Sequence, residues 1–171
     1  MAGNKYIALI SGKLKEVIGL QVSTGVSDAN KIPALDSAGR LDISLMPAGI
    51  TAEVVVAPTS ENLTAGNIVN LYNNAGALTI RKADATTNTK PAYGFVMANT
   101  TSPANATMYI LGVANSFVTG KTVGATYYLD TTAGGVTATP PSASGNIVQE
   151  IGIATATTEI LTNNNPTVEI S

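Results

Sequence analysis

The sequence predicts an all-β protein: a small β-barrel or β-sandwich built from two similar β-units and preceded by an extended N-terminal arm. The first observation behind this prediction is composition. Ala, Thr, Gly, Asn and Val are abundant among the 171 residues, and Thr and Val fit pleated strands while Gly and Asn fit short turns. The second is an internal repeat, and the third is that the first 50 residues lie outside it. We therefore expect an arm at 1–50 and one β-domain at 51–171.

The repeat has a spacing of 58 residues. Residues 55–100 align with 113–158 without a gap, and twelve of the forty-six positions are identical. The strongest part places "LTAGNIVNLYNNAGALT" over "KTVGATYYLDTTAGGVT", so that glycines, a leucine and a turn coincide. This regularity indicates duplication of one supersecondary unit, with the two copies at 55–111 and 113–171.

Each copy predicts the same series of strands. A strand at 67–72 or 125–130 runs into the turn "NNAG" or "TTAG", and a second strand at 77–82 or 135–139 completes a hairpin. A polar loop leads to a strand around Gly94 or Gly152. The last strand is expected in "ATMYILGV" for the first copy and in "PTVEIS" for the second.

The N-terminal 50 residues have a different pattern. Residues 5–22 are β-patterned around a break at Gly12, residues 23–30 form a flexible polar linker, and "DSAGR" at 36–40 is a turn. Leu41, Ile43 and Leu45 alternate with polar residues, as in a strand with one buried face.

Two prolines, at 33 and 47, each lack a backbone donor, which excludes a central strand here. We therefore expect an extended arm that lies along another surface. Its expected protein-binding residues, which would contact another protein or a sister subunit, are Ile32, Leu35, Leu41, Ile43, Leu45, Met46 and Pro47.

Catalytic chemistry has little support in these residues. The chain has no His and no Cys, which excludes Ser–His–Asp and Cys–His nucleophiles and imidazole or thiolate metal sites. The near carboxylate pairs, Glu53 with Glu61, Asp36 with Asp42 and Glu150 with Glu159, lack glycosidase or EF-hand spacing. "TGKT" at 119–122 lacks the first glycine of a P-loop and precedes a strand-like segment. We expect no enzyme activity, catalytic residue, cofactor or metal, although a small carboxylate-based hydrolase or lyase remains an alternative.

Charge and hydropathy limit the partners. The net charge is −2 and the nine basic residues are scattered, so no stripe of positive charge predicts nucleic-acid binding. No apolar run approaches the length of a membrane span, and no secretion signal or cysteine is recognisable, so the chain is expected to fold in a cytoplasm. Only 12% of residues are charged, which predicts that part of the surface is covered in an assembly.

The stretch "KIPALDSAGRLDISLMPAGI" at 31–50 resembles a recurrent segment of virion structural proteins of tailed bacteriophages. Downstream, "NLTAGNIVNLYNNAGALTIRKADATT" and "GATYYLDTTAGGVTATPPSASGNIVQEIG" are similar to β-domains of phage head-decoration and fibre proteins. The resemblance implies assembly without enzymatic activity, commonly as a homotrimer, with one part anchored on the particle.

The function this resemblance implies is that of a capsid decoration, or cement, protein. It would bind the major capsid protein on the outer surface of the shell, stabilise the shell, and reside in the virion after assembly in the host cytoplasm. The alternative is a head- or tail-fibre component whose β-domain binds a host-surface glycan.

Overall fold

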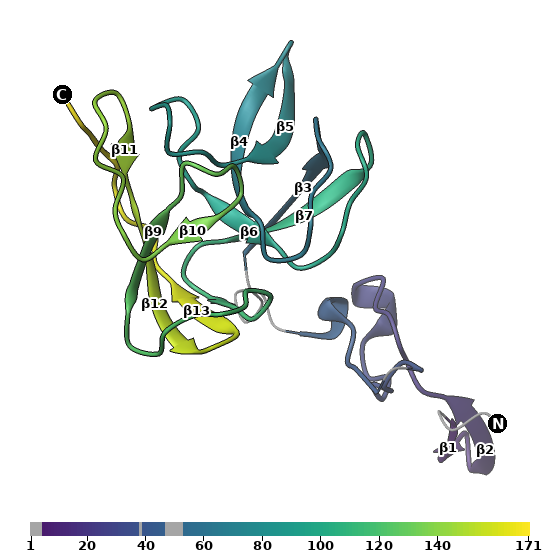
Figure 1. Cartoon of the computed structure of the whole chain (residues 1–171). Helices are drawn as coiled ribbons and strands as arrows, with labels where there is room; N and C mark the ends of the chain where they lie inside the picture. The colour runs from purple at the N-terminus through teal and green to yellow at the C-terminus, as the bar shows by residue number, and fades with distance from the viewer. Residues whose placement is uncertain (1–4, 38, 47–52) are drawn as a thin grey trace. The chain divides into compact units, whose positions relative to one another are not determined.

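The structure is a computed structural model that describes residues 5–37, 39–46 and 53–171. The chain divides into two compact units, Met1–Thr51 and Ala52–Ser171, which are described separately. Apart from two single-turn 3-10 helices, every regular element in the described residues is a strand. The prediction of an all-β protein is therefore confirmed (Figure 1).

The N-terminal unit begins with a two-stranded hairpin. Strand β1 (Lys5–Ile10) pairs antiparallel with β2 (Lys13–Ile18). Ser11 and Gly12 form the turn, with φ of 52° and 74°, the positive values that a two-residue hairpin turn requires. The 3-10 helices η1 (Val26–Asp28) and η2 (Ile43–Leu45) follow.

The second unit contains two five-stranded antiparallel sheets. The first has the strand order β3-β7-β6-β4-β5, formed by Val54–Pro58, Asn105–Ile110, Gly94–Val96, Ile68–Asn74 and Ala77–Lys82. The second has the order β8-β13-β12-β9-β10, formed by Ala114–Asn115, Glu159–Thr162, Glu150–Ala156, Thr126–Leu129 and Val136–Thr137. A further short pair joins β11 (Ile147–Val148) to β14 (Val168–Glu169).

The two sheets have the same strand order when strands are matched along the chain. The register agrees as well, because Ile68 pairs with Phe95 and, 58 residues later, Thr126 pairs with Ile153. Matching glycines also have matching surroundings. A Cβ atom on Gly94 would lie 2.3 Å from the carbonyl oxygen of Tyr109, and one on Gly152 would lie 2.0 Å from that of Leu161. Only glycine allows the neighbouring strand to approach this closely.

The last strand of the second copy differs from the sequence prediction. The expected strand in "PTVEIS" supplies β14, but β14 pairs with β11, and the fourth strand of the second sheet is β13. Gly94 pairs with a residue 16 positions later (94 to 110), whereas Gly152 pairs with one only 10 positions later (152 to 162). The second copy is therefore six residues shorter at this connection, so a gapless alignment places its last strand too late.

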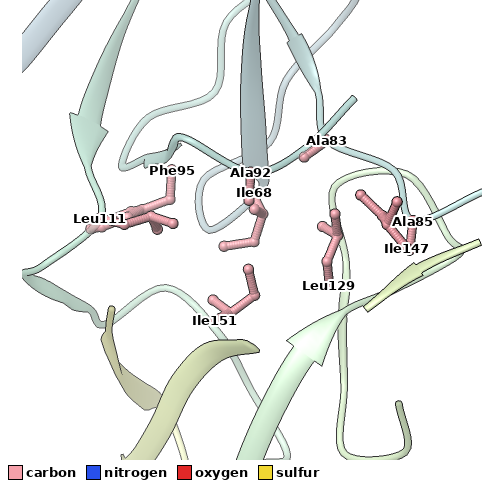
Figure 2. Packing of buried hydrophobic residues seen from close by; sticks show 9 residues of the cluster. All are labelled: Ile68, Ala83, Ala85, Ala92, Phe95, Leu111, Leu129, Ile147 and Ile151. Carbon is pink, nitrogen blue, oxygen red and sulfur yellow. The ribbon is translucent and has the colours of Figure 1, made fainter. Parts of the chain in front are cut away.

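The hydrophobic core has three parts. The largest lies between the two repeats and combines residues of the first, such as Ile68 and Phe95, with Leu129, Ile147 and Ile151 of the second (Figure 2). A second cluster, including Val69, Ile80, Val96 and Met108, lies on the other face of the first sheet, and Tyr127, Ala154 and Ile160 form a third on the second sheet. Both faces of β6 and of the first three residues of β4 are therefore buried.

Neither five-stranded sheet closes into a barrel through paired strands in the described part of the chain. An isolated bridge from Thr59 to Ile80 joins the edge strands β3 and β5 of the first sheet, which curls this sheet around its own core. The arrangement is therefore sandwich-like, with the curled first sheet and the second sheet packed on a shared core.

Polar contacts also join the two repeats. The Ile147 N–H donates to the Ala85 carbonyl (2.8 Å), and the Ile68 N–H donates to the Gly134 carbonyl (3.0 Å). The buried Gln149 side chain accepts a hydrogen bond from the Ala92 N–H (2.7 Å) and donates to the Ala92 carbonyl (3.0 Å). Buried amides need such partners because unpaired ones are costly.

Candidate functional site

The N-terminal unit has almost no core. Every buried hydrophobic residue of the described chain lies between Ala57 and Ile160, in the second unit. In the described residues before Thr51, Gly19 alone is buried. Large apolar side chains are instead exposed throughout this unit: Ile7, Leu9, Ile10, Leu14, Ile18, Val22, Val26, Ile32, Leu35, Leu41 and Met46. This is the surface we identify as the candidate functional site, and we call it the N-terminal apolar surface.

One face of the hairpin contributes most to this surface. Side chains alternate between the two faces of a strand, and the register places Ile7, Leu9, Leu14 and Ile18 together on one face. These four side chains are 64–76% exposed. Lys5 and Glu16, on the same face, form an ion pair. A two-stranded hairpin is marginally stable by itself in water, so this hairpin gains stability from any partner that covers the face.

Ile32 and Leu35, two of the residues expected to bind a partner, lie beside an ordered crossing of the chain. The Leu20 N–H donates to the Ile32 carbonyl (2.8 Å), and the Ala34 N–H donates to the Leu20 carbonyl (2.8 Å). The Gln21 side chain donates to the Leu35 carbonyl (2.7 Å). These bonds use main-chain carbonyls, which leaves both apolar side chains more than half exposed.

The prediction of a strand at 41–45 is wrong, because residues 43–45 form the 3-10 helix η2. The Asp42 carboxylate accepts a hydrogen bond from the Ser44 N–H (2.9 Å), and the Leu45 N–H donates to the Asp42 carbonyl (3.0 Å). Asp is favoured at such a position because its side chain caps the first turn. Hydrogen bonds from Ser44 lower the pKa of this carboxyl group.

The other predicted binding residues have different positions. Leu41 and Met46 are exposed and Leu45 is half-buried. Ile43 lies in η2, but its side chain is outside the described part of the structure, and Pro47 is outside the described residues altogether. The Ser23 N–H donates to the Ser44 hydroxyl (2.8 Å), so η2 and Leu35 both attach to the stretch that follows β2.

The segment 23–30 is not the flexible linker that its composition predicts. Asp28 accepts hydrogen bonds from the Thr24 N–H (2.6 Å) and the Thr24 hydroxyl (2.8 Å), and it forms an ion pair with Lys31 (2.6 Å). The hydrogen bond from Lys31, followed by those from Thr24, lowers the pKa of this carboxyl group to about 2. Asp28 thus holds the loop around η1, while Val26 remains exposed.

The sequence-based list of binding residues omitted the hairpin. The apolar residues Ile7, Leu9 and Leu14 are visible in the sequence as points of a strand-like pattern. Such a pattern alone does not show whether the apolar face is buried against the chain's own core or exposed to solvent. The structure makes that distinction, because no described part of the chain buries these side chains.

The remaining polar clusters have structural roles. Glu61 accepts a hydrogen bond from the Lys82 N–H (2.9 Å). Glu159 accepts from Ser116 and Thr155 (2.6 Å each), which lowers its pKa. Residues 119–122 lie in a loop before β9 and do not open a helix, as the rejection of a P-loop predicts. The described residues contain no group of three or more His, Cys, Asp or Glu side chains placed to hold a metal ion.

No protein-family model, curated protein or solved structure matches the chain. Among the described residues, no helix has the length and apolar character needed to cross a membrane.

Proposed function

We propose that the chain is a non-enzymatic structural protein of a tailed-phage virion, a capsid decoration protein that binds the outer surface of the shell formed by the major capsid protein. The observation that carries this proposal is the contrast between the two units. The second unit has its own core, whereas the described part of the first exposes most of its large apolar side chains. Apolar patches of this kind mark protein interaction sites.

In this proposal the N-terminal unit attaches the protein to the particle and the β-domain forms the exposed knob. Burial of apolar surface is the main favourable term in stable protein association. The N-terminal apolar surface supplies such a term, and the two charged residues on the apolar face of its hairpin, Lys5 and Glu16, form an ion pair with each other. Attachment of this type strengthens a shell by covering junctions between its subunits.

The proposed assembly is a homotrimer, which the resemblance to phage decoration proteins implies. Three linked attachment units raise the apparent affinity well above that of one unit, because the second and third binding events are intramolecular. A trimer would also give the hairpins of sister subunits a place to pair.

The test is to compare the full chain with residues 52–171 for binding to particles of the parent phage that lack the protein. The full chain is expected to sediment with the particles, and the fragment is expected to stay folded in solution and unbound. Imaging of decorated particles should show hundreds of copies spread evenly over the shell. Equal binding by the fragment, or a few dozen copies at one vertex or on the tail, would reject the proposal.

The second candidate is a head- or tail-fibre component that binds a host-surface glycan. One observation favours it: a half-open pocket on the first repeat is lined by uncharged residues, among them Asn99, Asn105 and Tyr109. Copy number and location on the particle separate this candidate from the first.

A further inference from the structure

The two five-stranded sheets carry matching rows of side chains on their outer faces, the faces turned away from each sheet's own core cluster. Directly paired residues of neighbouring strands lie on the same face of a sheet. On the first sheet the row crosses β3, β7, β6 and β4 and consists of Val54, Tyr109, Phe95 and Ile68. On the second sheet the row crosses β8, β13, β12 and β9 and consists of Ala114, Leu161, Ile153 and Thr126. The chain therefore contains the same face twice.

The two rows differ in what covers them. Phe95 and Ile68 are 0% and 1% exposed, because the second repeat packs on them in the shared core (Figure 2). Ile153 and Leu161, which are paired with each other, are 45% and 47% exposed. Within the described residues, the face that the first repeat buries is thus left open on the second.

The surface that does the covering is also present twice. Leu129 and Ile151 of the second repeat are fully buried on the first repeat's row. The residues 58 positions earlier are Leu71, which is half-buried, and Tyr93, which is 44% exposed. The Tyr93 N–H donates to the Val69 carbonyl (2.9 Å), so Tyr93 lies beside β4, which contains Leu71. The first repeat therefore keeps an exposed counterpart of the surface with which the second repeat covers it.

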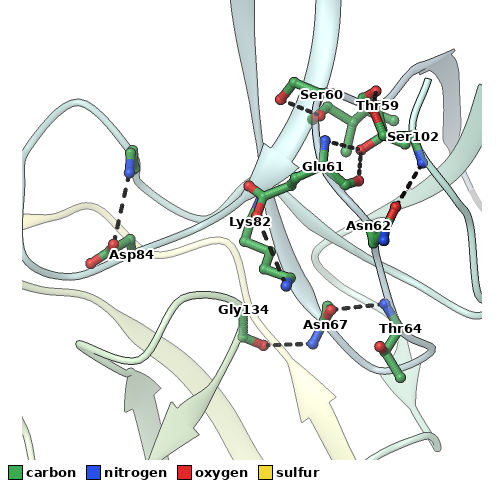
Figure 3. A network of polar contacts seen from close by, with 12 residues as sticks. Thr59, Ser60, Glu61, Asn62, Thr64, Asn67, Lys82, Asp84, Ser102 and Gly134 are labelled. Atoms are coloured by element: carbon green, nitrogen blue, oxygen red, sulfur yellow. Dashed lines mark hydrogen bonds and ion pairs between the residues drawn. The ribbon is translucent and has the colours of Figure 1, made fainter.

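The hairpin turns show the same asymmetry. In the turn of the second repeat, the Gly134 carbonyl accepts hydrogen bonds from the Ile68 N–H (3.0 Å) and the Asn67 side chain (3.5 Å), the latter shown in Figure 3. A Cβ atom on Gly134 would lie 3.0 Å from the Asn67 amide nitrogen, whereas one on the matching Gly76 would have no atom within 4 Å among those described. The turn of the second repeat thus lies against the first repeat, and the turn of the first repeat is uncovered.

Both halves of the contact that joins the repeats therefore have an unoccupied counterpart on the same chain. We propose that the outer face of the second sheet, at Ile153 and Leu161, packs on the surface formed by Leu71 and Tyr93 in the first repeat of a second copy of this chain. Such a contact joins two different surfaces head to tail, and it closes into a ring where the rotation between copies allows. The low proportion of charged residues, 12%, agrees with burial of surface in an assembly.

This inference rests on the proposed homo-oligomer, for which it names the contact within the β-domain. It does not depend on attachment to a particle. A second copy is favoured as the occupant because the equivalent face of the first repeat is already covered by a unit of this same fold.

The test is cross-linking between full-length chains in the absence of particles. The chain has no cysteine, so single cysteines can be introduced at chosen positions. Chains carrying Ile153→Cys and chains carrying Tyr93→Cys are co-expressed and treated with a short bismaleimide reagent. A dimer that links residue 153 of one chain to residue 93 of another is expected, and either variant alone should give little product.

Two matched controls accompany this experiment. Val123→Cys co-expressed with Val168→Cys places cysteines at side chains that are 60% and 65% exposed and should give only background cross-linking. Addition of Leu161→Asp to the Ile153→Cys chain should lower the yield of the 153–93 product about tenfold, because a buried apolar contact is replaced by a charge. Addition of Val123→Asp instead should leave the yield unchanged.

Four results would overturn the inference. They are a 153–93 yield no higher than the control pair, an equal yield from Ile153→Cys alone, an unchanged yield with Leu161→Asp, and a product that forms only when particles are present. The third does so because Leu161 would then lie outside the contact, and the fourth because the shell and not a second copy would bring the two positions together. Particle binding is measured separately on the parent chain. Binding without the cross-link rejects this inference alone, and the cross-link without binding rejects only the proposed function.

Discussion

Replacing Ile32 and Leu35 by aspartate tests the proposed attachment most directly. These side chains are 53% and 55% exposed. The hydrogen bonds at these positions involve the carbonyls of both residues and not their side chains. The double variant Ile32→Asp/Leu35→Asp should therefore keep the fold of the N-terminal unit while placing two charges in the contact with the particle.

The size of the effect follows from the exposed area. Complete burial of an Ile or Leu side chain contributes about 1.5–3 kcal/mol. About half of each of these side chains is still exposed. Burial of that half by a partner therefore contributes about 0.8–1.5 kcal/mol per side chain to the free energy of binding. Loss of both amounts to about 1.6–3 kcal/mol, or an affinity lower by about 15- to 150-fold. Desolvation of the aspartates adds to this loss.

The assay is co-sedimentation of the purified chain with undecorated particles over a range of concentrations. Leu78→Asp with Val123→Asp is the matched control, because these β-domain side chains are 53% and 60% exposed. The control should bind as the parent chain does. Equal affinity for the Ile32/Leu35 variant, or an equal loss in both double variants, would refute the assignment of the N-terminal apolar surface as the attachment site.

Three further predictions concern stability and ionisation. Gly152→Ala should lower the free energy of unfolding by about 2–4 kcal/mol, measured by urea denaturation. The reason is that the new Cβ would lie 2.0 Å from the Leu161 carbonyl oxygen. A change below about 1 kcal/mol would contradict the close approach of the strands. Ala75 has a φ of 52° in the hairpin turn, a backbone conformation that Asn adopts at lower cost than Ala. Ala75→Asn should therefore raise the free energy of unfolding by about 0.5–1 kcal/mol, and with it the melting temperature. An unchanged or lower melting temperature would argue against this turn. The pKa of Asp28 should be about 2 when it is measured by carbon NMR, and Lys31→Ala should raise this pKa toward 3.8. Because the pKa is lowered in the folded state, the stability that the ionised Asp28 contributes is present above about pH 4 and is lost as the pH falls through about 2. An unchanged pKa in the variant would contradict the ion pair.

The repeat is the part of the fold that the sequence predicts best. Its 58-residue spacing locates β4 with β9, β5 with β10 and β6 with β12, since glycines and turns mark the same positions in both copies. The last strand of the second copy could not be located in this way, because the connection to β13 is six residues shorter and low similarity there hides the deletion. The sequence predicts one β-domain built from both copies, but it does not reveal which residues form their shared core, because that depends on tertiary packing.

The N-terminal unit shows the limits of pattern reading more clearly. Alternation at 41–45 resembles a strand, yet the Asp42 side chain competes by capping a helical turn. The polar segment 23–30 resembles a linker, yet Asp28 and Thr24 close it into a loop. In both cases a local side-chain hydrogen bond outweighs the average tendency of the composition.

The shared core has a consequence for how such genes can exchange parts. Leu129, Ile147 and Ile151 pack against Ile68 and Phe95 of the other repeat. A genetic crossover between the repeats would therefore combine the two halves of this core from different genes, and their side chains would not have evolved to pack together. The boundary at Thr51 and Ala52 separates no members of any core cluster. Recombination at that boundary would keep the β-domain core intact while replacing the segment before it, and we expect natural chimaeras of this protein to have their junctions there.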